Sequence, residues 1–214
     1  MPRQPPPDLD SRERLLKAGL AMARTRGLRR LTVRGVAAAA QANLGSFVYH
    51  FGTREAFVTE LIERLYAPML ARLEVSAGAD TDPLASLRQV LLQFAQWVIA
   101  QRDFVAHVLL DANAGEGAAQ RFLASMDKRH PALLLAMIVR AQQAGRLRRE
   151  EPAHVMLVLM STLAMPAVFF HLLGPQLPRP LAQTVVPYTT DMAHVEKRLD
   201  WALRALAPDE ESAR

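Results

Sequence analysis

The segment 31–57 restricts the fold more than any other part of the chain. It predicts two short helices on either side of a three-residue turn, followed by the start of a long helix. Thr32 can cap the first short helix and Asn43 the second, because their side-chain oxygens can accept the unpaired N–H groups of a first helical turn. Thr53 can cap the long helix in the same way. With one more helix before it, this arrangement is typical of a helix-turn-helix module.

The rest of the chain is also predicted to be helical. Apolar residues recur every three or four positions, and no segment alternates long enough to indicate a strand. The expected helices cover about 10–26, 32–40, 44–50, 54–77, 84–100, 104–112, 118–144, 153–173 and 191–207, with a linker at 78–83 and an irregular connection over 173–187. The predicted fold class is therefore all-α.

Positive charge is concentrated at the N-terminus. The first 55 residues contain ten Arg or Lys and four acidic residues, a net charge of +6. The remaining 159 residues have a net charge of −1, so the whole chain's +5 comes from its first quarter. A small basic helical module attached to a nearly neutral body indicates a polyanionic partner, and DNA fits best.

Several protein classes are disfavoured. The chain has no cysteine, which excludes a disulfide framework and a thiolate metal site. It has no run of 18 apolar residues and no apolar signal core, so we expect a cytoplasmic protein with no membrane partner. Metalloprotease, phosphate-loop and nucleophile-elbow motifs are absent from the sequence. We therefore expect no catalysis, no cofactor and no metal.

Residues 12–61 resemble the N-terminal domain of the TetR family, the tetracycline-repressor-like bacterial regulators. The matching positions are RERLLKA over 12–18, Gly27, Leu31 to Arg34, Val36 and Ala37, AQANLG over 40–45, and then Phe47, His50, Phe51, Thr53, Arg54, Glu55 and Phe57. Three positions depart from the family pattern. Val48 stands where a Tyr is common, with a Tyr at 49 instead; Gln41 replaces the turn glycine; and Ala23 replaces a large aromatic residue.

The resemblance implies a dimeric DNA-binding regulator, usually a repressor that a small ligand releases. It also implies a domain order: a disordered arm over 1–9, the DNA-binding domain over 10–57, a larger helical domain for effector binding and dimerisation over 58–207, and a flexible tail over 208–214. The long helix from Arg54 would join the two domains.

The candidate DNA-binding residues lie on the two short helices and at the start of the long one. Arg34 matches a family position that reaches DNA, and His50 and Arg54 match phosphate-contacting positions. Leu44 can meet a thymine methyl group, and free N–H groups at the start of the long helix suit a phosphate. The full set is Thr32, Arg34, Asn43, Leu44, Gly45, Ser46, Tyr49, His50, Thr53 and Arg54. Phe47, Phe51 and Phe57 are expected to be core residues.

The second domain offers a less specific site. An apolar pocket between helices could bind an effector, with Trp97, Phe104, His107, Met137 and Phe169 as its candidates. The alternative is that these residues form ordinary helical core.

The last two predicted helices carry apolar stripes that could form a dimer seam. The stripes comprise Leu157, Met160, Ala164 and Val168 on one helix and Val195, Leu199 and Leu203 on the other, with Trp201 turned elsewhere. Packing of the same stripes within one chain is the alternative. A two-fold dimer would present two recognition helices to a palindromic operator.

The resulting functional hypothesis is a ligand-responsive repressor released by a small apolar or amphipathic effector. An activator or a ligand-independent regulator would share the same DNA-binding module. A helical carrier or enzyme that does not bind DNA would leave the basic N-terminal quarter unexplained.

Overall fold

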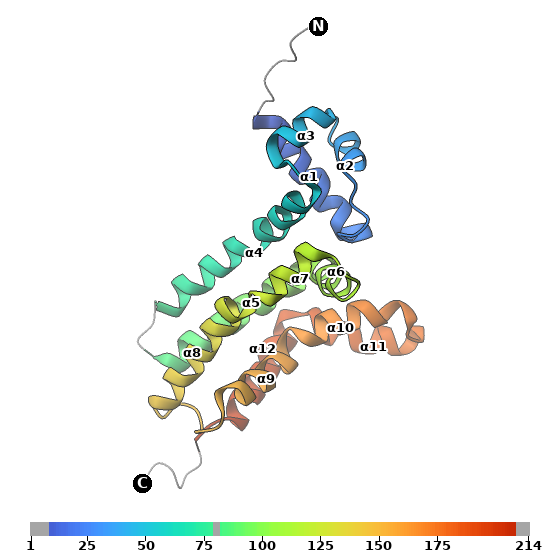
Figure 1. Cartoon of the computed structure of the whole chain (residues 1–214). Helices are drawn as coiled ribbons and strands as arrows, with labels where there is room; N and C mark the ends of the chain where they lie inside the picture. Colours follow the sequence, from blue (N-terminus) through green and yellow to red (C-terminus); the bar gives the residue numbers. More distant parts are fainter. Residues whose placement is uncertain (1–8, 79–81, 209–214) are drawn as a thin grey trace, which may run out of the picture. The chain divides into compact units, whose positions relative to one another are not determined.

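The computed structural model describes residues 9–78 and 82–208, and every regular element within these ranges is a helix (Figure 1). The predicted all-α class is confirmed. Residues 1–8 of the predicted arm, 79–81 of the predicted linker and 209–214 of the predicted tail fall outside the described residues.

The chain divides into two compact units. The first contains the chain up to Tyr66 together with Asp103–Ala124, and the second contains Ala67–Arg102 with everything from Ser125 onward. This division differs from the expected boundary at residue 57, because Asp103–Ala124 packs with the N-terminal helices. Helical periodicity shows that a face is apolar, but it does not show which partner covers that face.

The helices of the first unit, apart from the shorter α7, follow the predicted ones closely. They are α1 (Leu9–Arg26), α2 (Val33–Ala39), α3 (Leu44–Phe51), the first part of α4 (Arg54–Gly78), α6 (Arg102–Asn113) from Asp103 on, and α7 (Gly117–Ala124). All three predicted caps are present. Thr32 Oγ1 accepts from the N–H of Gly35 at 3.1 Å, Asn43 Oδ1 from Ser46 at 2.7 Å, and Thr53 Oγ1 from Ala56 at 3.1 Å.

An aromatic cluster forms the centre of this unit. The rings of Phe47, Phe51 and Phe57 have centroids 4.8–5.4 Å apart, in tilted and edge-to-face arrangements. All three side chains are buried, as the sequence predicts. Phe104 of α6 joins the same core, which also includes Leu15 of α1. The core therefore fixes α3 against α1 and α4 and leaves the opposite face of α3 outside.

Gln41 adopts a left-handed backbone conformation in the turn between α2 and α3, with φ of +51°. This is the position at which the sequence departs from a turn glycine. A side chain here is strained, whereas glycine adopts such a φ freely. We expect Gln41→Gly to raise the free energy of unfolding by about 0.5–1 kcal/mol. Urea unfolding at fixed protein concentration measures this free energy. The control is Ala38→Gly at an exposed position of α2, which should lower stability. A loss of stability in Gln41→Gly would contradict this account of the turn.

The second unit contains the remaining helices. These are the rest of α4, α5 (Pro83–Ala100), η1 (Met126–Lys128), α8 (His130–Gln143), α9 (Pro152–Leu163), α10 (Met165–Leu173), η2 (Gly174–Gln176), α11 (Arg179–Thr190) and α12 (Met192–Ala205). Among residues 9–78 and 82–208, no single helix is long and apolar enough to span a membrane. The pair formed by α9 and Met165–Gln176 is together long and apolar enough, but the two helices are bent by 47° at the break between them.

Proline sets where three of the later helices begin. In the segment 118–144, Pro131 was expected to kink or start a helix, and it lies in the first turn of α8. The predicted helix over 153–173 divides in the same way at Pro166 in the first turn of α10. The predicted irregular connection contains α11, where Pro180 occupies the first turn and Pro187 lies inside the helix. A proline in a first turn sacrifices no intrahelical hydrogen bond, so these residues start helices here.

The predicted dimer stripes are largely used inside the chain. Val195 and Leu199 of α12 are fully buried, and Ala164 and Val168 are buried as well. The alternative of intramolecular packing therefore holds for these residues. Leu157 and Trp201 remain more than half exposed.

His130 is half-buried at the start of α8, where its ring stacks on Phe94 with centroids 4.5 Å apart. Burial, with a smaller contribution from Arg129, lowers the pKa of His130 from 6.5 to about 4. Between these values the unfolded chain binds a proton that the folded chain does not, so stability falls as the pH falls. We expect the free energy of unfolding to drop by about 2 kcal/mol from pH 7 to pH 5 on account of this residue. Urea unfolding at both pH values should show a smaller drop in His130→Asn, and an equal drop would contradict the assignment.

Candidate nucleic-acid interface

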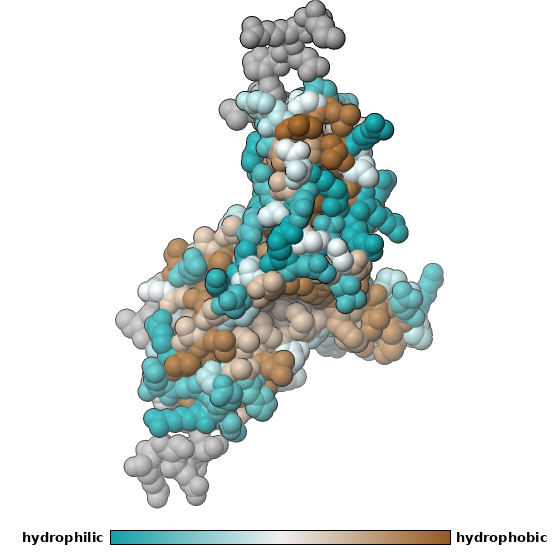
Figure 2. All heavy atoms as spheres, viewed as in Figure 1, coloured by the Kyte–Doolittle hydropathy of each residue, from teal (hydrophilic) through white to brown (hydrophobic). Residues whose placement is uncertain are grey.

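The outer face of α3 is apolar and exposed. Leu44, Val48 and Tyr49 are 44%, 57% and 70% exposed, although the inner face of the same short helix is buried in the core. Gly45 lies exposed beside them. In Figure 2 hydrophobic residues gather in the region of α3 among hydrophilic ones. Such a face on a basic module can enter a DNA major groove and contact thymine methyl groups.

Polar and charged groups border this face at the starts of three helices. Thr32 and Arg34 are exposed at the start of α2, and Thr53 is exposed at the start of α4. Asn43 is exposed at the start of α3, with its side-chain oxygen already accepting from Ser46. The exposed side chains can contact phosphates on either side of a groove, and Arg34 can instead form a two-bond contact with guanine.

Ser46 lies on the other side of α3. Its exposed fraction is 8%, and its neighbour Phe47 is in the core. Ser46, one of the predicted DNA-binding residues, therefore lies on the buried side of α3 and away from its exposed apolar face. Val48 is the residue that the prediction omitted. Its spacing of four from Leu44, which places both on one side of a helix, is the signal that identifies it.

His50 is half-buried at the end of α3. Its Nε2 is hydrogen-bonded to Ser11 Oγ of α1 at 2.9 Å, and its ring meets Tyr49 edge-on with centroids 5.2 Å apart. The bond joins the end of the exposed helix to the beginning of α1. His50 therefore orients α3 and Tyr49 from within the unit.

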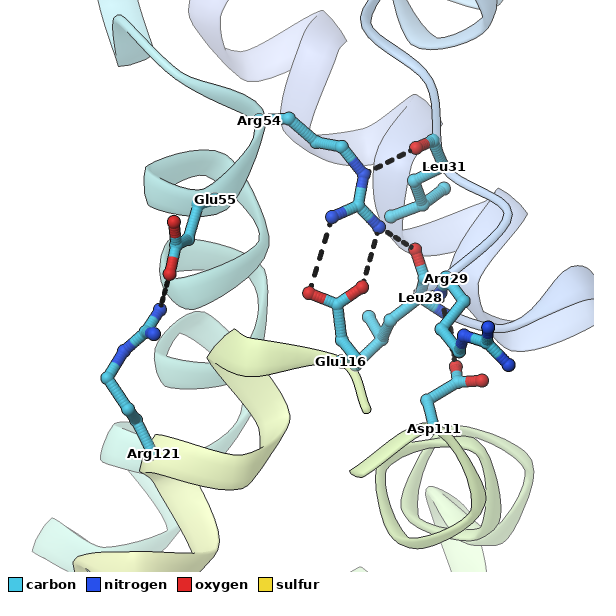
Figure 3. Close-up of polar contacts among 8 residues, drawn as sticks. All are labelled: Leu28, Arg29, Leu31, Arg54, Glu55, Asp111, Glu116 and Arg121. Carbon is cyan, nitrogen blue, oxygen red and sulfur yellow. Dashed lines mark hydrogen bonds and ion pairs between the residues drawn. The ribbon is translucent and has the colours of Figure 1, made fainter. Parts of the chain in front are cut away.

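Arg54 makes a set of internal bonds that the sequence does not predict (Figure 3). Its Nε donates to the carbonyl of Leu31 and its Nη2 to the carbonyl of Leu28, each at 2.7 Å. The guanidinium also meets both carboxylate oxygens of Glu116, at 2.7 and 3.3 Å. Glu116 is only 7% exposed. The Arg54 side chain therefore ties the loop before α2 to the start of α7, while its phosphate contact stays a prediction.

A second carboxylate holds the same loop. Asp111 Oδ2 of α6 accepts from the backbone N–H groups of Leu28 at 2.5 Å and Arg29 at 3.3 Å (Figure 3). Gly27 ends α1 with φ of +82°, and a Cβ at this position would lie 2.7 Å from that carboxylate oxygen. No local sequence signal identifies Asp111 or Glu116, because their partners lie 62 to 83 residues away along the chain.

The five candidate effector residues do not share one unit. Phe104 is buried in the core of the first unit, and His107 lines an arginine-rich hollow of the same unit. In the second unit Met137 is buried, Trp97 is half-buried and Phe169 is exposed. The candidates are thus divided between the two units, and the effector pocket stays a prediction. Within the described residues, no group of three His, Asp or Glu side chains could hold a metal ion.

Solved structures share this fold over most of their length. The structure titled "SmeT-Triclosan complex" is 22% identical, with a TM-score of 0.69, and the match covers 94% of this chain and 93% of that one. The ketosteroid transcriptional regulator KstR2 of Mycobacterium tuberculosis is 20% identical, with a TM-score of 0.69 and coverage of 92% and 95%. The transcriptional regulator FadR from Bacillus subtilis, in complex with stearoyl-CoA, is 12% identical, with a TM-score of 0.64 and coverage of 85% and 98%. No curated protein is significantly similar in sequence.

The capped helices, the tight turn and the outward-facing α3 define a helix-turn-helix DNA-binding protein. Residues 15–61 match the profile of "Bacterial regulatory proteins, tetR family". The N-terminal part of the chain therefore carries a helix-turn-helix domain of the TetR type.

Proposed function

We propose that this regulator binds a palindromic operator as a homodimer and represses transcription until a small effector releases it. The exposed apolar face of α3 is the observation that carries the proposal. Leu44, Val48 and Tyr49 are exposed, yet the Asn43 cap and the aromatic cluster hold their helix in place. Leu44, Gly45 and Tyr49 would contact bases, with Val48 beside them.

Phosphate contacts would supply most of the affinity. Arg34, Thr32 and Thr53 lie exposed beside α3, and the free N–H groups at the start of α4 suit a phosphate oxygen. Asn43 and His50 would support α3 from its two ends. A protein acting on chromosomal DNA would work in the cytoplasm.

A second copy of the chain would complete the DNA-binding surface. The second unit exposes large apolar residues on α9, α10 and α12, including Leu157, Phe169 and Trp201. Exposed apolar residues of this size are suited to burial between two copies. A two-fold axis would then place two α3 helices on two half-sites.

The effector would be apolar or amphipathic and would bind in the second unit. Structures of similar fold are described with triclosan and with stearoyl-CoA, which fits a ligand of this character. α4 runs from the first unit into the second, so a shift of this helix would alter the separation of the two α3 helices. A coupling free energy of about 1–3 kcal/mol would suffice for a switch.

Selection of bound duplexes from a random pool tests the proposal. We expect an inverted repeat to be enriched, with an affinity that falls steeply as salt rises. Enrichment of sequences without symmetry would contradict the dimeric operator. A thermal-shift screen of apolar and amphipathic compounds then identifies effectors by a raised melting temperature, and an effector should also weaken operator binding.

A further inference from the structure

The first unit has an arginine-lined hollow at the end of α1 opposite to the end that contacts α3. Its volume is about 520 Å³, and it is lined by Arg26, Arg29 and Arg30 together with Thr25, His107 and Asp111. Every lining residue belongs to the first unit. The volume lies within the range of small-molecule sites, which is roughly 300–1,000 Å³.

The three arginines of the hollow differ from several other arginines of this unit in having no acidic partner among the described residues. Arg12, Arg54, Arg64 and Arg121 each form an ion pair with a glutamate. Arg26, Arg29 and Arg30 are exposed, and none of them pairs with an acidic side chain in the described parts of the chain. Three adjacent guanidinium groups around one hollow repel each other, so an anion between them would lower the free energy.

The one acidic residue of the hollow does not neutralise the three arginines. The Asp111 carboxylate is directed to the backbone, where it accepts from the N–H groups of Leu28 and Arg29. The side chains that surround the hollow therefore remain predominantly cationic, and the His107 imidazole adds a possible N–H donor.

Guanidinium groups bind phosphate through two parallel N–H bonds, and several such groups favour a ligand with more than one phosphate oxygen to offer. We propose that this hollow is a phosphate-binding site, which takes a phosphate ester or a pyrophosphate group. The source is either a phosphorylated small molecule or the DNA backbone.

The position of the hollow determines whether each source of phosphate could bind without covering the exposed face of α3. His50 joins α3 to Ser11, whereas the hollow begins at Thr25, which is roughly 20 Å further along α1 at 1.5 Å per residue. In Figure 1, α6 lies beside the C-terminal end of α1, away from α3. A small molecule would bind there without occupying the α3 face, whereas a DNA phosphate would reach it only next to α2.

Isothermal titration of the full chain with sodium pyrophosphate, at constant ionic strength, tests the site. The variant Arg26→Gln, Arg29→Gln, Arg30→Gln removes the three charges, and Arg72→Gln, Arg149→Gln, Arg179→Gln is the control with the same net charge. We expect the first variant to bind pyrophosphate at least about tenfold more weakly than the wild type, and the control to remain within about twofold. All six side chains are exposed, so both variants should melt like the wild type.

Binding of a random-sequence duplex as a function of salt separates the two sources, and it does not require the operator of the proposed function. If DNA phosphates occupy the hollow, the slope of log affinity against log salt becomes shallower by about 0.9 for each lost contact, in the first variant only. If pyrophosphate affinity falls while the two slopes agree, a phosphorylated small molecule is the ligand. Equal pyrophosphate affinities together with equal slopes in the two variants would overturn the proposal.

Discussion

Replacing Glu116 with Gln should lower the free energy of unfolding by about 3 kcal/mol. The carboxylate of Glu116 is almost fully buried and meets the Arg54 guanidinium through two bonds, at 2.7 and 3.3 Å. The substitution keeps the shape of the side chain but removes its negative charge, and it replaces one of the two acceptors by an NH2 donor that faces the guanidinium. Removing one member of a buried pair costs more than the pair itself contributes, because the remaining charge stays desolvated. Arg54 is 32% exposed, which places the effect at the low end of the range for buried pairs.

The neighbouring pair of Glu55 and Arg121 provides the matched control. Both of its side chains are more than half exposed, so Glu55→Gln should change stability by less than about 1 kcal/mol. Urea unfolding of the full chain at fixed protein concentration measures both variants. If Glu116→Gln costs no more than Glu55→Gln, the bonds of Arg54 do not hold the loop before α2.

The second large effect concerns DNA. The double variant Arg34→Ala, Tyr49→Ala should bind the selected operator at least about 100-fold more weakly than the wild type, because each half-site loses a charged contact and a large base-facing side chain. Both residues are exposed, so the variant should unfold like the wild type. Fluorescence anisotropy with a labelled operator duplex measures the affinity.

Two further variants make this result specific. Ser46→Ala should remain within about threefold of the wild type, since the Ser46 side chain is buried beneath the exposed face. Arg72→Ala removes an exposed charge on α4 far along the chain from α3, and it should also have little effect. Full affinity in the Arg34 and Tyr49 double variant would show that the reading surface lies elsewhere.

Local signals in the sequence were sufficient for the helix-turn-helix. Thr32, Asn43 and Thr53 can cap only a helix that starts directly after them, and all three do so. The spacing of Phe47, Phe51 and Phe57 predicted a shared core in the same way. Such features depend on residues a few positions apart, so sequence patterns capture them.

Contacts between distant segments were not predictable in this way. Arg54 stands at a family position associated with phosphate contact. Only the fold shows that its guanidinium is bonded to Glu116. Phe104 has the periodicity of any core residue, and nothing near it in sequence shows that it joins the N-terminal unit. The helix α11 was missed for another reason: proline both interrupts and starts helices, and its meaning depends on where the preceding helix ends.

The most direct test of the account asks whether α3 reads bases through its apolar face. Each thymine of the selected half-site is replaced in turn by deoxyuracil, which removes only the C5-methyl group. For the wild type, at least one replacement should weaken binding by about 1 kcal/mol, or roughly fivefold. The same replacement should have no effect in the Leu44→Ala, Val48→Ala variant, which has already lost the side chains that would touch the methyl group. An equal loss in both proteins, or no loss at any thymine of the half-site, would contradict the central claim that this face of α3 contacts the bases.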